Sequence, residues 1–452
     1  MRSLSDNANA IRLAIFTIII YIAAMTVGAR LLYYLSYVLA AVLVSAFVWS
    51  QLSKRGLRIR RSVEPSQAQV GQTVQETIEV ENLSRVRKLW LEVRDRSTLP
   101  GHQVGAVVSL RGQGAKRWRV RTRCTHRGLY RLGPTAVLTG DPFGLFQVGR
   151  VFDASSELLV YPATVPLGSF GLPVGELPGG AKTERRAFHS TPNAAGVREY
   201  MPGDPMNRIH WPMSARTQRL MVKEFELDPT ADLWLILDLH EDVHVVADDY
   251  DPMAAAGVPG PSWGHGGLGG LRADVLPVSH ADSTGTIQID PSTEEYSVTV
   301  VASLAAYFLS QGRSVGLIAW GQHRVTVPAD RGGRQLTKIL RALAVLRAEG
   351  TSPLAEVLAA ETHLFGKQDT LIVVTPSLGE EWVSALQVQL YKTASAVAVI
   401  VEPGTFGGSG NPLLTVSALS TINVPTYLVK RDDAINASLG QQYAGPAMRN
   451  LR

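Results

Sequence analysis

The chain has 452 residues, of which 18% are charged and 45% hydrophobic, and a chain of this length supports two to four domains with a large core. Typical globular proteins have about 25% charged and 45–50% apolar residues, so this composition excludes a disordered chain and a coiled coil. The net charge of +5 is too small to make the whole chain a nucleic-acid binder. The single cysteine, Cys124, excludes a disulfide framework or a cysteine metal site within one chain.

Two apolar runs, 11–29 and 31–49, open the chain and are separated by Arg30. Each would span about 28 Å as a helix, close to the ~30 Å hydrocarbon core of a bilayer. A cleaved signal peptide is the alternative, because residues 27–29 are small. Its removal would leave the second run bare at the new terminus, so residues 1–53 are predicted to form a transmembrane helical hairpin.

The orientation of this hairpin follows from the basic residues at its ends. Arg2 and Arg12 flank the first run, and five basic residues lie between Lys54 and Arg61, whereas the turn contains only Arg30. The positive-inside rule then places both ends in the cytoplasm. We therefore expect a multi-pass protein of the cytoplasmic membrane, in contact with the lipid bilayer, with the bulk of the chain in the cytoplasm.

Residues 54–165 lack a helical period and alternate instead. Trp118, Val120, Thr122 and Cys124 fall on one face of a predicted strand, with four arginines on the other face. Turn-like residues recur along this stretch, which predicts a small antiparallel β-sandwich-like domain. The arginines are Arg117, Arg119, Arg121 and Arg123.

The same region is strongly basic. Residues 84–131 contain 13 lysines and arginines against only Glu92 and Asp95, a local net charge of +11. Nucleic-acid binding is disfavoured, because no aromatic platform interleaves the arginines. We expect the arginine face to lie near anionic lipid headgroups, where each basic residue contributes about 1 kcal/mol, or to meet an acidic protein partner.

Two motifs in the chain are highly specific. The first reads RGLYRLGP at residues 127–134 and continues with DPFGLF at 141–146; the second reads REYMPGD at 198–204, followed by RIHW at 208–211 and SAR at 214–216. Together they resemble the bacterial family called domain of unknown function 58. The resemblance covers nearly the whole chain and implies a membrane hairpin, a β-rich segment and a C-terminal von Willebrand factor A-like domain. It also implies association with a MoxR-type AAA+ ATPase.

The second motif combines a turn at Pro202–Pro205 with arginines, acids and apolar anchors such as Trp211. We expect residues 166–229 to dock the two folded domains on each other through a structural or partner-binding cluster. Its members, together with one acid of the first motif, are Asp141, Arg198, Asp204, Arg208, Trp211, Ser214 and Arg216.

A hydrolase built on Asp204, His210 and Ser214 is the alternative interpretation of this motif. Pro212 interrupts any helix that would place His210 and Ser214 on one face, and no nucleophile elbow surrounds the serine. No catalytic residue is therefore predicted.

Residues 230–430 predict a doubly wound α/β domain, followed by a tail over 431–452. Residues 233–238 form a buried strand that ends in Asp238, and a loop rich in glycine and proline over 243–290 is expected to be a mobile insertion. Helices and strands then alternate. The expected elements are Thr293–Gln311, Ser314–Ala319, Arg334–Ala348, Pro353–Leu364, Thr370–Val374, Glu380–Leu390 and Ala396–Val401.

A von Willebrand A-like domain implies a metal site formed by an Asp-x-Ser-x-Ser loop, a threonine and a further aspartate. Here the loop reads DLHED at 238–242, Thr351 matches the threonine, and the last aspartate is replaced within residues 374–377. Because only two of five ligands match, no metal or cofactor is predicted. Asp238 is expected to be a paired or capping acid. The alternative is that a divalent ion binds here, with Asp242 partly substituting for the missing ligands.

These observations favour a membrane-anchored, non-enzymatic interaction or adaptor protein that works with an AAA+ ATPase in complex assembly. The alternatives are the hydrolase, and binding of anionic lipid or nucleic acid through the arginine-rich strand.

Overall fold

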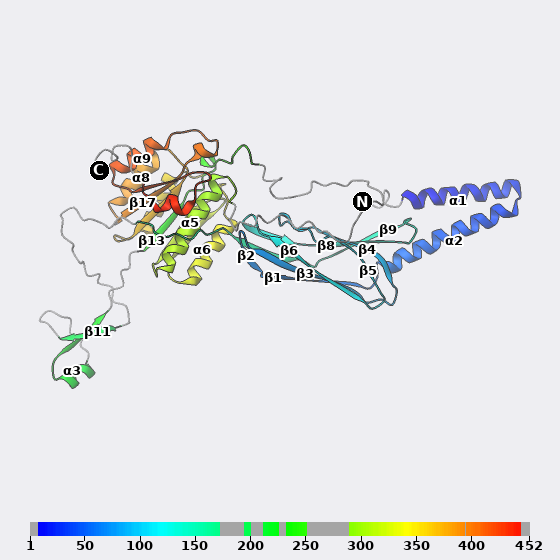
Figure 1. Ribbon diagram of the computed structural model, residues 1–452, viewed down its shortest axis with the longest axis horizontal. Coiled ribbons are helices and arrows are strands. Elements are labelled where there is room, and N and C mark those ends of the chain that lie inside the picture. Colours follow the sequence, from blue (N-terminus) through cyan, green and yellow to red (C-terminus); the bar gives the residue numbers. More distant parts are fainter. Residues whose placement is uncertain are drawn as a thin grey trace. The chain divides into compact units, whose positions relative to one another are not determined.

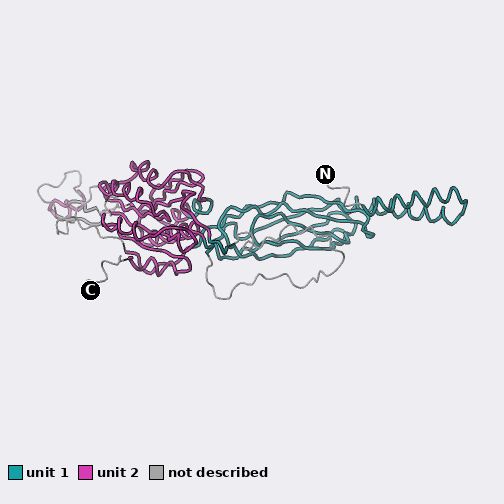
Figure 2. Tube along the Cα trace, turned by 90° about the horizontal axis from the view of Figure 1, so that it is seen from above, with its two compact units in different colours: residues 1–163, 247–291, 340–346 teal, residues 164–246, 292–339, 347–452 magenta. Residues whose placement is uncertain are grey.

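The computed structural model describes residues 8–171, 194–199, 211–225, 232–250, 289–393 and 395–443. The chain divides into two compact units (Figure 2). Unit 1 comprises residues 1–163, 247–291 and 340–346, and unit 2 comprises residues 164–246, 292–339 and 347–452.

Unit 1 begins with two apolar helices, α1 (Ala8–Val27) and α2 (Arg30–Ser53), which pack on each other (Figure 1). Gly28 connects them with a φ of +75°, a backbone conformation that side-chain-bearing residues rarely adopt. Both helices are long and apolar enough to cross a membrane. Helix α2 continues to Ser53, four residues beyond the predicted apolar run.

The β-rich part of unit 1 forms three sheets. One has the antiparallel order β1-β3-β6, the second the antiparallel order β5-β4-β8-β9, and the third the order β2-β10-β7, in which β2 and β10 are parallel. The strands are β1 (Leu57–Glu64), β2 (Gln67–Gln69), β3 (Thr73–Asn82), β4 (Lys88–Asp95), β5 (Ala106–Leu110), β6 (Ala115–Arg123), β7 (Gly128–Leu132), β8 (Thr135–Gly140), β9 (Gln147–Phe152) and β10 (Ser156–Tyr161).

The first two of these sheets share a core. Ile78 and Val80 on β3 lie in one buried cluster with Leu91 and Val93 on β4 and Val137 on β8. Strands β3 and β8 alternate buried and partly buried positions, as a sheet packed on one face requires. The predicted β-rich region is thus confirmed, as sheets packed face to face.

Unit 2 is built on one six-stranded sheet with the order β15-β14-β13-β16-β17-β18. All neighbours are parallel except β14 and the edge strand β15. The strands are β13 (Leu233–Leu237), β14 (Val315–Trp320), β15 (Arg324–Asp330), β16 (Thr370–Thr375), β17 (Ser395–Val401) and β18 (Thr426–Val429).

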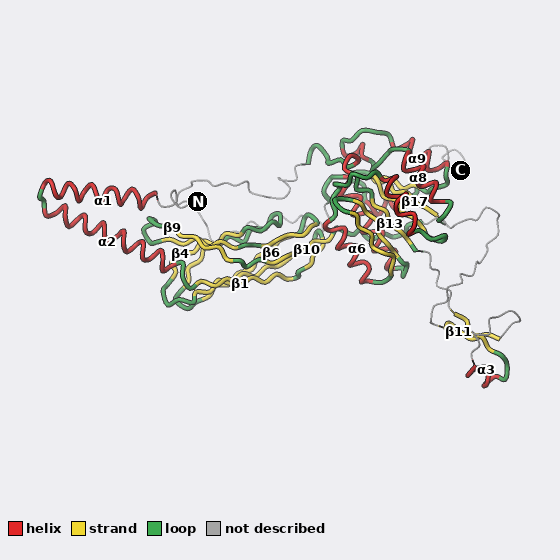
Figure 3. Tube along the Cα trace, turned by 180° about the vertical axis from the view of Figure 1, so that it is seen from behind, coloured by secondary structure: helices red, strands yellow, loops and turns green. Residues whose placement is uncertain are grey.

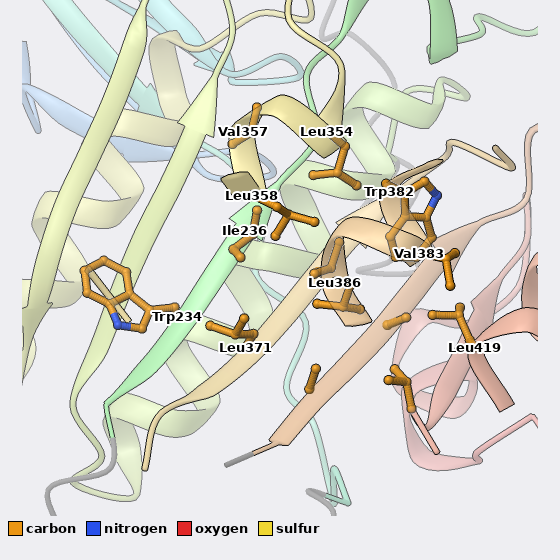
Figure 4. Packing of buried hydrophobic residues seen from close by; sticks show 14 of the residues in the cluster. Trp234, Ile236, Leu354, Val357, Leu358, Leu371, Trp382, Val383, Leu386 and Leu419 are labelled. Atoms are coloured by element: carbon orange, nitrogen blue, oxygen red, sulfur yellow. The ribbon is translucent and has the colours of Figure 1, made fainter. Parts of the chain in front are cut away.

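Helices cover both faces of this sheet. On one face, Trp234 and Ile236 of β13 pack with Leu358 of α7, Leu386 of α8 and Leu419 of α9 (Figure 4). On the other, α5 contacts β13, β14, β16 and β17. The helices are α5 (Thr293–Ser310), α6 (Gly333–Val345), α7 (Leu354–Ala360), α8 (Glu381–Leu390), α9 (Pro412–Thr421) and α10 (Ile435–Gly440), with short 3₁₀ turns η2 (Glu241–Val243), η3 (Glu361–Leu364) and η4 (Pro403–Phe406). The last part of α6, from residue 340, is assigned to unit 1.

The predicted α/β region is therefore confirmed, with differences in detail. Strand β15, strand β18 and helices α9 and α10 were not predicted, and the helix expected over 353–364 consists of α7 followed by η3. The structure describes residues 243–250 of the expected insertion at 243–290. Val243 ends η2, and Val246 forms an isolated β-bridge with Ser292. Residues 251–288 lie outside the described residues.

Between β10 and β13, the structure describes a separate small element (Figure 3). Strands β11 (Ala194–Glu199) and β12 (Met221–Phe225) pair antiparallel, and the short helix α3 (Trp211–Thr217) lies between them in sequence.

Candidate functional site

The carboxyl ends of the parallel strands in unit 2 bring polar side chains to one edge of the sheet. Asp238 follows β13, and Thr375 ends the neighbouring strand β16. The Thr375 hydroxyl donates to Asp238 Oδ2 at 2.6 Å, and the His240 backbone N–H donates to Oδ1 at 3.1 Å. The Ser377 N–H in turn donates to Thr375 Oγ1 at 2.8 Å. Both carboxylate oxygens of Asp238 therefore accept a hydrogen bond.

The electrostatics of Asp238 follow from its burial. The residue is only 3% exposed, and this burial raises the pKa of its carboxyl group above the ordinary value. The bonds from Thr375 and from the His240 backbone act in the opposite direction, because they stabilise the charged form.

The loop after Asp238 is held by further bonds at the same edge. Because a carbonyl can only accept, His244 Nε2 is the donor to the Asp238 carbonyl at 3.0 Å, and its Nδ1 lies 3.2 Å from the Thr293 hydroxyl at the start of α5. Gly350 pairs with both sides of His240: its N–H donates to the Leu239 carbonyl, and its carbonyl accepts from the Glu241 N–H.

The expected alternative metal ligands are exposed at this edge. The Asp242 side chain is 82% exposed, with Oδ2 3.9 Å from His240 Nε2, and Thr351 is also exposed. In the part of the chain that the structure describes, no group of three or more His, Cys, Asp or Glu residues is placed to hold a metal ion.

The first signature motif places Asp141 in the turn between β8 and β9. Its two carboxylate oxygens accept from the backbone N–H groups of Phe143 at 2.8 Å and Phe146 at 2.6 Å. The Gly144 N–H also donates to the Asp141 carbonyl. Asp141 is buried and fixes the path of this turn.

The second signature motif is described only in part. Arg198 lies on β11, opposite Val222 of β12. Ser214 is buried, and its hydroxyl oxygen accepts from the Met221 N–H at 2.8 Å, which links α3 to β12.

Trp211 stands at the first position of α3, a helix with one buried residue, and it is 65% exposed, so the described residues do not bury this side chain. Arg216 is exposed on the same helix. Asp204, Arg208 and His210 lie outside the described residues.

The arginine face of β6 has the predicted alternation but a different charge environment. Arg117, Arg119 and Arg121 are exposed and Arg123 is half-buried, while Val120 and Thr122 are buried. The neighbouring strand β3 supplies acids and amides that the window 84–131 did not include. These are Glu79, which pairs with Arg117 at 3.1 Å, and Gln75, which accepts from Arg121 at 3.4 Å. The surface is thus less cationic than the local count of +11 indicates.

A buried ionic cluster inside unit 1 was not predicted. Arg61 Nε lies 2.7 Å from Glu76 Oε1, and Arg61 Nη2 pairs with Asp95. His102 Nε2 lies 2.6 Å from Glu76 Oε2, and Thr122 Oγ1 lies 2.8 Å from His102 Nδ1. The sequence does carry a signal for this cluster: Arg61 on β1 and Glu76 on β3 occupy inward positions among mainly apolar ones.

Comparisons with known proteins agree with the signature. Residues 196–249 match the model of the family described as "Protein of unknown function DUF58". The chain is 23% identical over 389 residues to the "Uncharacterized protein YeaD" of Bacillus subtilis (strain 168), and the aligned region covers 82% of each chain.

Among solved structures, the chain is similar to the CARDB domain of the PF1109 protein from Pyrococcus furiosus, with 18% identity and a TM-score of 0.18 over 23% of this chain and 91% of that one. The C-terminal domain of wzt matches with 12% identity and a TM-score of 0.19, over 24% and 75% of the two chains. From β11 to the loop after Asp238, the chain is therefore similar to DUF58 proteins, and over most of its length it is similar to YeaD.

Proposed function

We propose that this chain is a membrane-anchored interaction protein whose β-rich and α/β regions work in the cytoplasm. The observation that carries the proposal is the large apolar surface of α1 and α2. In water this surface would be unfavourable by about 25 cal/mol for each Å² of apolar area, whereas a bilayer covers it. Its exposed side chains include Ile15, Phe16, Ile18, Ile19, Ile22, Met25, Leu31, Tyr34, Val38, Val44 and Val48.

The α/β region is proposed to be von Willebrand A-like. Its first strand, β13, lies between β14 and β16, so the strand order reverses there. Open α/β sheets bind their ligands beyond the carboxyl ends of the strands, at such a reversal. Asp238 and the exposed Asp242 stand at this edge, which favours it as the surface that a partner contacts.

The partner that the family resemblance implies is a MoxR-type AAA+ ATPase, with this chain as its membrane adaptor in complex assembly. The DUF58 match over 196–249 supports this choice of surface, because it includes β13 and the whole Asp238–Asp242 loop.

The test is co-purification of the full chain from membranes in detergent, with and without ATP. Recovery of an AAA+ ATPase is expected for the wild type and for Lys367→Ala, an exposed residue at the opposite, amino-terminal edge of the sheet. Asp242→Ala, which alters the carboxyl edge, is expected to reduce recovery. Failure to recover any ATPase with the wild type would remove the adaptor proposal, and equal recovery with both variants would remove the carboxyl edge as its surface.

A further inference from the structure

Helix α2 is fixed to the β-rich part of unit 1 at its carboxyl end. Lys88 on β4 is fully buried, and its ammonium donates to the Leu52 carbonyl at 2.6 Å, in the last turn of the helix. Just after the helix, the Gly56 carbonyl accepts from the Leu83 N–H at 2.6 Å. A cation at a helix carboxyl end is favoured by both the unpaired carbonyls and the helix dipole. The position of the sheets along the axis of α2 is therefore set.

The turn between β8 and β9, residues 141–146, reaches back alongside α2. The ring of Phe146 meets the ring of Phe47 edge to face, with centroids 5.6 Å apart, and α2 contacts both β8 and β9 (Figure 1). Phe47 lies six residues before Ser53, which is about 9 Å along the helix axis. The 141–146 turn therefore lies alongside α2, about 9 Å before the carboxyl end of the helix and toward the apolar part of the helix.

The length of α2 places this contact at the edge of a bilayer. Its 24 residues span about 36 Å, against a hydrocarbon core of about 30 Å, so only about one helical turn extends beyond that core. Trp49 lies between Phe47 and the helix end, and tryptophan is enriched at the boundary between hydrocarbon and headgroups. Phe47 and its contact Phe146 are therefore at or inside this boundary.

The turn presents an apolar tip at that level. Phe143 is 62% exposed, and Pro142 beside it is also exposed. The two bonds that Asp141 accepts from the backbone hold the turn in shape, and Gly144 supplies a φ of +68°. The tip is rigid, so an exposed aromatic ring there is held in place without ordering a loop.

We propose that the 141–146 turn is a third membrane contact, which inserts Phe143 into the interfacial layer of the bilayer beside α2. The inference rests on the proposed membrane anchor and assigns a role to the DPFGLF motif. Arg55, Arg85 and Arg87 are exposed near the same end of α2, where positive charge faces the anionic phospholipid headgroups.

The experiment places a fluorescent label on the tip. Phe143→Cys in the full chain is labelled with an environment-sensitive dye and reconstituted into vesicles of phosphatidylcholine and phosphatidylglycerol. Half of the samples contain lipid brominated near the headgroup end of the acyl chains. Cys124 can stay in place, because it is fully buried and burial raises its pKa to about 11. The matched control is Leu129→Cys, an apolar residue on β7 with 56% exposure.

The expected result is a blue-shifted emission that brominated lipid quenches at position 143, and neither effect at position 129. Equal behaviour of the two labels in vesicles that retain the chain would overturn the insertion while leaving the anchor intact. If the wild-type chain does not float with the vesicles, the anchor itself fails. Pro142→Cys is a second tip variant with the same expected result, and it decides the question if Phe143→Cys exposes Cys124 to the dye and so reports misfolding.

Discussion

Replacing Arg61 by methionine tests whether the buried ionic cluster of unit 1 holds the β-rich fold together. The Arg61 side chain is 2% exposed and lies between the carboxylates of Glu76 and Asp95, which are 1% and 4% exposed. Methionine keeps most of the volume but removes the cation. Stranding a buried charge by removing its partner costs about 3–5 kcal/mol. The same change at Arg117, whose pair with Glu79 is exposed on β6, should cost no more than about 1 kcal/mol.

Amide hydrogen exchange of the full chain in detergent measures this difference locally, without requiring two-state unfolding of a multidomain protein. At 1.4 kcal/mol for each tenfold change, exchange in β3 and β6 should become about a hundredfold to a few thousandfold faster in Arg61→Met. Adding Glu76→Gln to Arg61→Met should slow it again, because one stranded charge is removed. Exchange in Arg61→Met as slow as in Arg117→Met would refute the reasoning.

Asp238→Asn should abolish a pH dependence in the α/β sheet. Because burial raises the pKa of Asp238, the contribution of this carboxyl to the stability of β13 is fully present below pH 3.8 and is lost as the pH rises through the raised value. Amide exchange of β13 across this range checks it, and identical profiles for both proteins would contradict it. Lys88→Met removes the donor to the Leu52 carbonyl and should destabilise the end of α2 by about 1.5–3 kcal/mol. Amide hydrogen exchange over residues 52–57 should then become faster, and unchanged exchange there would show that this hydrogen bond contributes nothing. Cys124 should resist alkylation at pH 8 until the chain is unfolded, since its thiol is buried with its pKa raised to about 11; mass spectrometry would detect any early labelling.

Local periodicity made much of the fold predictable. The alternation around Trp118 and Val120 identified β6 and its two faces, and the apolar run before Asp238 identified β13, which is buried at all five positions. Strand β15 was missed because its residues are only partly buried, as its place on the sheet edge requires. Such a strand shows neither a continuous apolar run nor a strong alternation.

The candidate site was predictable in one respect, the end-of-strand acid Asp238. Its partner Thr375 lies 137 residues further along the chain, and only the parallel pairing of β13 with β16 brings them together. Asp141 is the converse case. Its hydrogen-bond partners are only two and five residues further along the chain, so its turn-forming role could be inferred from the motif alone.

The local charge count of +11 meets the same limit, because it considers sequence neighbours alone. A window along the chain adds up charges that strand geometry then separates onto two faces, and it omits the neighbouring strand. On the outer face of the β1-β3-β6 sheet, Arg117 faces Glu79 across the β3–β6 pairing, and Arg58 faces Glu81 across the β1–β3 pairing. Charges directly opposite each other in a sheet interact more strongly than charges that are only close in sequence. Arg58 and Arg117 therefore already have acids beside them, whereas Arg119 and Arg121 lie opposite the uncharged Thr77 and Gln75. These pairs make Arg58 and Arg117 weaker candidates for contact with anionic headgroups than the exposed basic residues nearest α2.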